Sequence, residues 1–114
     1  MAVRAIKSQV PGVQCVCTGI SQFRQYGPAV GAGGIRDGWF DIAGFGRQAL
    51  AYPGFARDAL SGQMPDPEKC CVLCDSCFRL MNPGLSAAGC VVRDPDPYAS
   101  FYQRNVSDSE SRRT

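Results

Sequence analysis

Two short apolar runs in the first half of the chain predict two strands. Residues 13–17 (VQCVC) are rich in β-branched and other apolar side chains, begin just after a Pro-Gly pair and stop at Thr18, which is typical of a buried strand. A second compact run, 39–43, is interrupted only by Asp41 and leads directly into a glycine turn. We therefore expect two strands, the second followed by a tight turn and the start of a helix.

Helical signals follow each predicted strand. Four apolar residues behind the first strand fall at loosely helical spacing, namely Phe23, Tyr26, Val30 and Ile35. Ser21 is available as an N-cap, whereas Pro28 and several glycines make this helix poor on propensity. After the second strand, one short helix is expected from Arg47 until Pro53 stops it, and another over 55–60, ended by a Ser-Gly pair.

This alternation of strands and helices predicts an α/β fold. Strand, helix, strand, helix within about 60 residues is the rhythm of parallel β/α architecture, in which each βαβ unit takes roughly 30 or more residues. Two such units are too few for a closed barrel, because a (β/α)8 barrel takes about 250 residues. We expect the chain to be the end of a larger fold.

The second half of the chain divides at proline-rich joints. Residues 63–69 contain two prolines and are expected to be a linker, and 94–97 (DPDP) form another turn-rich joint before an aromatic stretch. The end, 106–114 (VSDSESRRT), is polar and predicted to be disordered. Three segments result: the β/α units at 1–62, a cysteine-rich segment at 63–104 and a disordered tail at 105–114.

Composition and charge narrow the partners. The 114 residues suffice for one small domain, and 12 Lys+Arg against 10 Asp+Glu give a net charge of +2, scattered along the chain. No nucleic-acid partner is expected. No apolar run approaches the roughly 18 to 20 residues of a membrane span, and 1–10 lack a signal-peptide stretch. We expect a soluble cytoplasmic protein with no membrane partner.

The chain has seven cysteines and no histidine. In a reducing compartment so many cysteines favour metal ligation or redox chemistry over disulfides. The absence of histidine excludes Ser-His and Cys-His pairs, His-ligated zinc and an imidazole proton shuttle within this chain. Chemistry is left to cysteine, arginine, tyrosine, carboxylates and backbone.

Two glycine turns follow the predicted strands. The second strand runs into Gly44-Phe45-Gly46-Arg47, and the first into Thr18-Gly19. Glycines let the backbone approach a phosphate, N–H groups at a helix start bind it, and an arginine adds a charge-assisted contact. Alternatively, the glycines only permit a tight turn, and Arg47 is a solvated surface residue. If these strands are the last two of a (β/α)8 barrel, both turns lie where such barrels often bind phosphate.

The stretch 70–80 (CCVLCDSCFRL) carries the strongest chemical pattern. Cys71, Cys74 and Cys77 are each separated by two residues, and Cys90 follows after a further twelve. One compact loop can then direct three sulfurs inward while a later turn closes the shell. Four thiolates select a soft centre, either a [4Fe–4S] cluster or tetrahedral zinc. Three cysteines on one run favour the cluster, because zinc sites more often come as two separated CxxC knuckles.

Other interpretations of the cysteines stay open. The thiols can be structural, with no metal at all. Cys70 can replace Cys71 as the first ligand, in a Cys70-x3-Cys74 arrangement. Cys15 and Cys17 lie in a predicted strand and are expected to be small buried core residues rather than ligands.

Three stretches together resemble a known family. They are GISQFRQYGPAVGAGGIRDGWFDIAGFGRQALAYPGFARDALSG, CCVLCDSCFRL and GCVVRD. In this order they resemble the C-terminal part of NADH:flavin oxidoreductases related to old yellow enzyme. The most similar branch is the iron–sulfur one, which includes 2,4-dienoyl-CoA reductase and trimethylamine dehydrogenase. The resemblance covers about residues 10–104.

The resemblance implies a fold and two cofactors. It implies the last two β/α units of an FMN-binding (β/α)8 TIM barrel, with 13–17 as strand seven and 40–44 as strand eight, plus a cluster-binding segment over 63–104. Matched to the FMN phosphate site are Thr18, Gly19, Gly44, Phe45, Gly46 and Arg47. Matched to the [4Fe–4S] ligands are Cys71, Cys74, Cys77 and Cys90, with the spacing of the trimethylamine dehydrogenase type.

The resemblance also implies an activity for the complete enzyme. FMN there takes hydride from NAD(P)H to reduce an enone or enoyl-thioester, or from an amine substrate, and the cluster passes single electrons. This chain departs from the family at Cys17, where relatives usually have a further glycine, and it lacks the first six strands with their catalytic acid residues and substrate pocket. Its catalytic residues are therefore unknown, and we expect no catalysis from the chain alone; another chain can supply the rest of the barrel.

Two alternatives of other classes remain. The chain can be a small non-catalytic protein in which zinc or a cluster nucleates residues 65–104, or a truncated, inactive gene product. Colour separates a cluster from zinc, because thiolate-to-iron charge transfer absorbs visible light and zinc does not. A truncated product is expected to unfold with little cooperativity and to aggregate.

Overall fold

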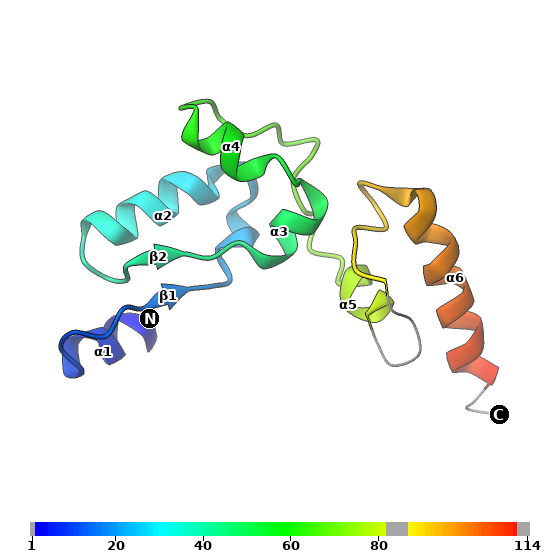
Figure 1. The fold of residues 1–114 in the computed structure, drawn as a ribbon, viewed down its shortest axis with the longest axis horizontal. Helices are drawn as coiled ribbons and strands as arrows, with labels where there is room; N and C mark the ends of the chain where they lie inside the picture. The colour runs from blue at the N-terminus through cyan, green and yellow to red at the C-terminus, as the bar shows by residue number, and fades with distance from the viewer. Residues whose placement is uncertain (1, 82–86, 112–114) are drawn as a thin grey trace.

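The computed structural model describes residues 2–81 and 87–111, and the structural statements below concern these residues (Figure 1). Its elements are α1 (Ala2–Gln9), β1 (Val16–Cys17), the 3-10 helix η1 (Ile20–Tyr26), α2 (Gly27–Arg36), β2 (Ile42–Ala43), α3 (Gly46–Ala51), α4 (Phe55–Leu60), α5 (Ser76–Leu80) and α6 (Pro95–Ser111).

The two strands pair in parallel, which confirms the expected pairing. Val16 lies opposite Ile42 and Cys17 opposite Ala43, with η1 and α2 forming the crossover between them. The backbone N–H of Gly44 extends the ladder by donating to the carbonyl of Cys17 at 2.8 Å. The paired stretches are shorter than the apolar runs 13–17 and 39–43, because each strand has a neighbour on one edge only. A complete barrel remains a prediction.

A small core lies under this strand pair. It consists of Cys15, Cys17, Ile20 and Phe40, with Val3, Ala43 and Phe45 packed against it. Both strand cysteines are buried, as predicted. Phe40 packs tightly against α2, since a Cβ atom added at Gly34 would lie 2.3 Å from the Phe40 ring. The glycines that make α2 poor on propensity thus let it approach the core closely.

The expected single helix after the first strand is two elements. η1 is kinked at Arg24, whose φ of 49° is left-handed, and α2 starts only at Gly27 with Pro28 in its first turn. The prediction of Ser21 as the N-cap is wrong. Ser21 is buried inside η1, and Gly19, with φ 86°, takes the capping position. A left-handed backbone favours glycine at this corner.

The short helices after β2 match the sequence signals. α3 ends at Ala51 before Pro53, and α4 covers Phe55–Leu60. They pack through a second cluster of Tyr52, Phe55 and Cys70, onto which Phe45 adds its ring at 5.0 Å from the Phe55 ring. The turn 44–47 is therefore anchored to α4 by aromatic contact.

Both ends of the described chain are more helical than predicted. α1 has no counterpart in the sequence analysis; its Lys7 forms an ion pair with Asp41, next to β2. Of the tail predicted to be disordered, 105–111 lie in α6, which continues to Ser111, and 112–114 lie outside the described residues. Once the aromatic stretch has nucleated a helix against α5, each further residue adds a hydrogen bond at little cost.

Candidate cofactor and metal site

The two glycine turns lie side by side at the carboxyl ends of the parallel strands. A Cβ atom added at Gly44 would lie 3.1 Å from the Thr18 methyl carbon and 3.3 Å from the Cys17 carbonyl oxygen. Gly19 occupies a left-handed conformation, and no atom lies within 4 Å of a Cβ built at Gly46. The turns thus form one backbone corner that is open at Gly46.

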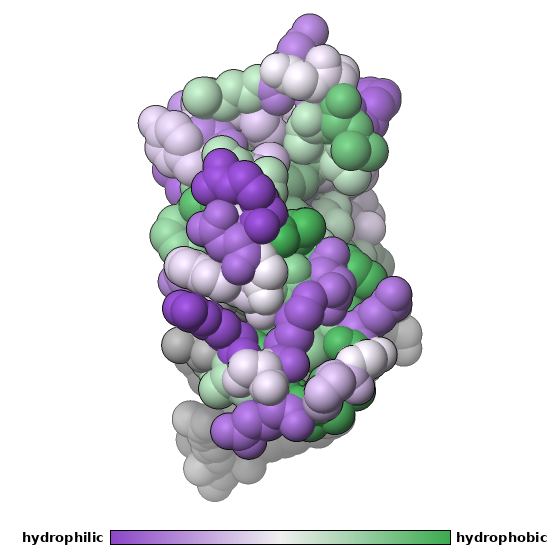
Figure 2. All heavy atoms as spheres, turned by 90° about the vertical axis from the view of Figure 1, so that its left-hand side faces the viewer, coloured by the Kyte–Doolittle hydropathy of each residue, from purple (hydrophilic) through white to green (hydrophobic). Residues whose placement is uncertain are grey.

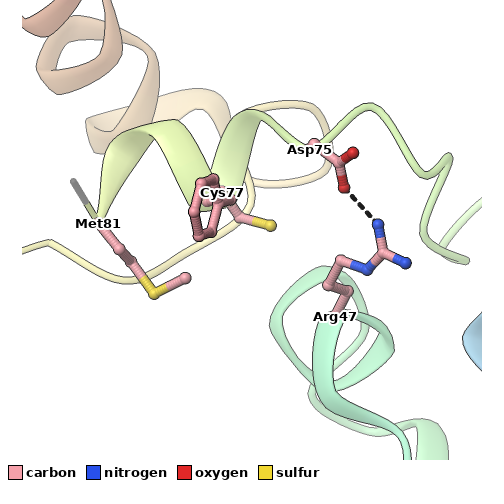
Figure 3. A pocket seen from close by; sticks show the side chains of 5 residues that line it. Arg47, Asp75, Cys77 and Met81 are labelled. Atoms are coloured by element: carbon pink, nitrogen blue, oxygen red, sulfur yellow. Dashed lines mark hydrogen bonds and ion pairs between the residues drawn. The ribbon is translucent and has the colours of Figure 1, made fainter. Parts of the chain in front are cut away.

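Arg47 reaches from this corner toward the cysteine loop. Its Nη1 atom forms an ion pair with the carboxylate of Asp75 (Figure 3). Both side chains are partly exposed. Arg47 is thus a surface residue with an anionic partner, and both its role at a phosphate and the alternative of a solvated surface residue stay open.

A cavity of about 390 Å³ lies between α3 and α5. It is lined by Arg47, Asp75, Cys77, Phe78 and Met81. In Figure 3 the Cys77 sulfur points from α5 toward the side on which the Arg47–Asp75 ion pair lies. The cavity therefore adjoins both the candidate phosphate residue and a candidate metal ligand.

The structure brings Cys71 and Cys90 together across the chain. Both are buried and pack with Ala51 of α3. The Cys71 sulfur accepts a hydrogen bond from the N–H of Leu73 at 3.4 Å, and the Cys90 sulfur accepts one from the N–H of Arg93 at 3.3 Å. Hydrogen bonds of this kind stabilise thiolates in iron–sulfur sites.

The backbone around Cys74 is bent in an unusual way. Leu73 and Asp75 have φ values of 61° and 58°, in the left-handed region that non-glycine residues avoid. Such residues cost of order 1–3 kcal/mol each and cluster at functional sites. Alternation of left- and right-handed residues also turns successive N–H groups inward, as in many Fe–S sites.

The thiols at 74 and 77 differ in acidity. Hydrogen bonds from the side chain and backbone of Ser76 lower the pKa of Cys74. Desolvation raises the pKa of Cys77, and the charges of the other three candidate ligands, Cys71, Cys90 and Cys74, raise it further. Cys77 therefore lies within electrostatic reach of all three.

The four thiols fit a thiolate centre in chemistry but are not closed into a shell. Among the described residues, no group of three or more Cys, Asp or Glu side chains is close enough to hold a metal ion. The N–H···S bonds and the left-handed bend are features of iron–sulfur sites, whereas the raised pKa of Cys77 opposes the thiolate form that a metal ligand needs. Cys71, Cys74, Cys77 and Cys90 could thus hold a [4Fe–4S] cluster or zinc.

Cys70 faces a different environment from Cys71. It has an exposed fraction of 0% and packs with Tyr52 and Phe55. Its carbonyl oxygen accepts a hydrogen bond from Nε of Arg93 at 3.0 Å. These contacts favour Cys71 as the first ligand.

Two residues of the site were missed from the sequence. Asp75 pairs with Arg47, and Gln48, completely buried in α3, accepts a hydrogen bond from the N–H of Cys71 at 3.1 Å. Neither belongs to a recognisable motif. The only signal in the sequence was that Gln48 directly follows Arg47, on the helix after the glycine turn, which places it near the candidate phosphate site.

Comparison with protein-family models, with curated proteins and with solved structures finds no match to this chain. No helix in the described part of the chain has the length and apolarity needed to cross a membrane. All seven cysteines lie in the described residues, and all are free thiols.

Proposed function

We propose that this chain is the C-terminal segment of an FMN-dependent NAD(P)H:flavin oxidoreductase of the old yellow enzyme family, iron–sulfur branch. The observation that carries the proposal is the contact between the glycine turn and the cysteine loop. Arg47 pairs with Asp75, and Gln48 holds the backbone of Cys71. Two candidate sites that are separate in the sequence thus share one short helix.

The glycine corner supports the flavin part of the proposal. When bound, FMN would supply hydride transfer from NAD(P)H to an enone or enoyl-thioester, or from an amine. The chain's part is to hold the phosphate through the open backbone at Gly46, the Thr18-Gly19 turn beside Gly44, and the guanidinium of Arg47. Arginine suits this role because it binds phosphate with two parallel hydrogen bonds.

The cysteine loop supports the cluster part. A [4Fe–4S] cluster would supply one-electron transfer, and Cys71, Cys74, Cys77 and Cys90 would be its ligands. Cys71 and Cys90 are already buried and hydrogen-bonded at sulfur, so they would bind with little loss of conformational freedom. The cavity beside Arg47 and Cys77 keeps the two cofactor sites adjacent.

The exposed sheet supports the rest of the barrel being supplied elsewhere. Val16 and Ile42 are 51% and 48% exposed, although parallel sheets are normally covered on both faces. We propose that six further strands cover this pair and bring the catalytic acid residues and substrate pocket. The seven free thiols support a reducing, cytoplasmic location.

The test is anaerobic purification followed by a visible spectrum, with iron, zinc and flavin quantified in the same sample. We expect broad visible absorbance at about 400 nm and about four irons per chain. Cys71→Ser should abolish the iron, whereas Cys70→Ser, in the aromatic core, should retain it. Colourless protein with one zinc would instead support the non-catalytic zinc protein, and iron retained in Cys71→Ser would contradict the ligand assignment.

A further inference from the structure

Gln48 has an unusual hydrogen-bonding state. It is completely enclosed, with an exposed fraction of 0%. Its Oε1 atom accepts the N–H of Cys71 at 3.1 Å, but its Nε2 atom has no partner among the described residues. Burying an amide N–H without a partner is unfavourable, because the group has lost its hydrogen bonds to water. In this structure no oxygen or sulfur atom of the described residues accepts these enclosed N–H groups.

The orientation of this amide is fixed. Cys71 presents an N–H donor, so the atom that faces it must be the carbonyl oxygen; exchanging oxygen and nitrogen would oppose two donors. Gln48 and Ala51 are three residues apart on α3 and share one face of that helix. Because Ala51 packs with Cys71 and Cys90, the amide lies on the face that meets the cysteine loop.

The side chains on this face offer only sulfur as an acceptor, although neither sulfur accepts the Gln48 amide in this structure. The cluster on it consists of Ala51, Cys71 and Cys90, with Leu73 packed against it. A buried water needs two to four polar partners, which alanine and leucine side chains do not provide. Each of the two sulfurs accepts one backbone N–H, and ionised sulfur has capacity for more.

We propose that Gln48 donates its Nε2–H to the sulfur shell of the metal centre while its Oε1 holds the Cys71 backbone. Gln48 would be a positioning residue that raises the reduction potential of the cluster, because a hydrogen bond to sulfur favours the more negatively charged, reduced form. The inference rests on the proposed function for the nature of the centre. Through Gln48, the helix that follows the glycine turn at 44–47 would then contact the metal centre directly.

The experiment is an equilibrium redox titration of the assembled, cluster-loaded protein with dithionite and mediator dyes, followed by the electron paramagnetic resonance of the reduced cluster. Gln48→Glu keeps the shape and an oxygen for Cys71 but loses the amide donor and adds a negative charge. We expect its ratio of reduced to oxidised cluster, at a fixed potential, to fall about tenfold, which is about 59 mV for a one-electron couple.

Two further variants control the result. Gln63→Glu makes the same charge change at an exposed position and should leave the potential unchanged. Gln48→Met, similar in length and free of buried charge, should shift the potential in the same direction by less, and it carries the test if Gln48→Glu does not fold. Full iron content with an unshifted potential in both Gln48 variants would overturn the inference.

Metal analysis of the wild type separates this inference from the proposed function. Zinc in place of iron would contradict the proposed iron–sulfur cluster. The role of Gln48 would then be tested by the affinity of the site for zinc. Gln48→Met should weaken Zn²⁺ binding by about tenfold in competition with a chelator, as loss of an outer-shell hydrogen bond does. Unchanged zinc affinity, or a wild type that takes up neither metal, would overturn the inference.

Discussion

At the residue scale, the ion pair of Arg47 with Asp75 shows what a phosphate must displace. Both side chains are partly exposed, so the pair contributes about 0–1 kcal/mol. A phosphate monoester carries about −1.5 to −2 charge at neutral pH and offers three acceptor oxygens. If the proposed FMN binds here, its phosphate should therefore take the guanidinium from Asp75.

The first prediction concerns this guanidinium. Arg47→Ala should weaken FMN binding to the assembled protein by roughly 10- to 100-fold, because a hydrogen bond to a charged group is worth about 1.5–3 kcal/mol. Quenching of flavin fluorescence in a titration measures the affinity. Arg36→Ala, which removes an exposed arginine paired with Asp37 on α2, is the matched control and should bind FMN normally. Equal affinities in both variants would contradict the phosphate site.

The second prediction concerns pH. Since the pKa of Cys74 is lowered and that of Cys77 is raised, Cys74 should be alkylated by iodoacetamide at a lower pH than Cys77 in the metal-free chain. Ser76→Ala removes the hydrogen bond that lowers the pKa of Cys74 and should move its rate profile to higher pH. Ser61→Ala, at the end of α4, should not. Mass spectrometry of the alkylated peptides gives the rate of alkylation of each cysteine at each pH. If the Cys74 profiles of the wild type and Ser76→Ala coincide, Ser76 does not lower the pKa of Cys74.

At the element scale, α2 illustrates how packing overrides propensity. Its glycines disfavour a helix in isolation, yet Gly31 and Gly34 face β2 and Phe40 where a Cβ atom would clash, whereas Gly33 faces open space. The helix is therefore stabilised by its close approach to the core. This contrast within one helix gives a matched pair of substitutions.

The third prediction uses that pair. Gly34→Ala should destabilise the protein by about 1–3 kcal/mol, because the new methyl group overlaps the buried Phe40 ring. Gly33→Ala should stabilise it by about 0.5–1 kcal/mol, since it only removes backbone freedom from the unfolded chain. Urea unfolding midpoints of the assembled protein measure both. Equal effects of the two substitutions would show that α2 does not pack on Phe40 in this way.

The elements that the sequence predicted are those with local signals. Pro53 marks the boundary between α3 and α4, and the β-branched run before Thr18 marks the first strand. The division of η1 from α2 at Gly27 depends instead on a left-handed Arg24, which no local pattern indicates. α1 was missed because it spans only eight residues, buries none of them fully and has no acidic residue in its first turn to mark its start.

The candidate site likewise contains residues that the sequence predicted and residues that it did not. Cysteine spacing predicted four thiols, and the structure places Cys71 beside Cys90. The bridges from α3 to the cysteine loop, through Asp75 and Gln48, are tertiary contacts between residues 28 and 23 positions apart. Because neither residue type is special in sequence, only the fold reveals them.

At the scale of the whole molecule, the chain is extended. Its radius of gyration is 17.0 Å, against about 13 Å for a compact domain of this length. In Figure 1, α5 and α6 lie to one side of the strand pair and its helices. Seen from the side of α1, apolar residues reach the surface between polar ones (Figure 2). Apolar residues mixed with polar ones in this way are normal on a protein surface, so the exposed face of the strand pair is the more specific sign of a surface that further protein covers.

The last prediction tests whether the strand pair is such a surface. Val16 and Ile42 are register partners, so their side chains share one face of the sheet. In the isolated chain, Ile42→Lys should reduce self-association, seen by sedimentation velocity, because a charge there opposes burial. Leu60→Lys on α4 makes the same change at a residue 88% exposed and should have little effect. If both variants suppress association equally, general hydrophobicity causes it; if only Ile42→Lys does, the sheet face mediates association, as expected of a surface that the proposed further strands would cover.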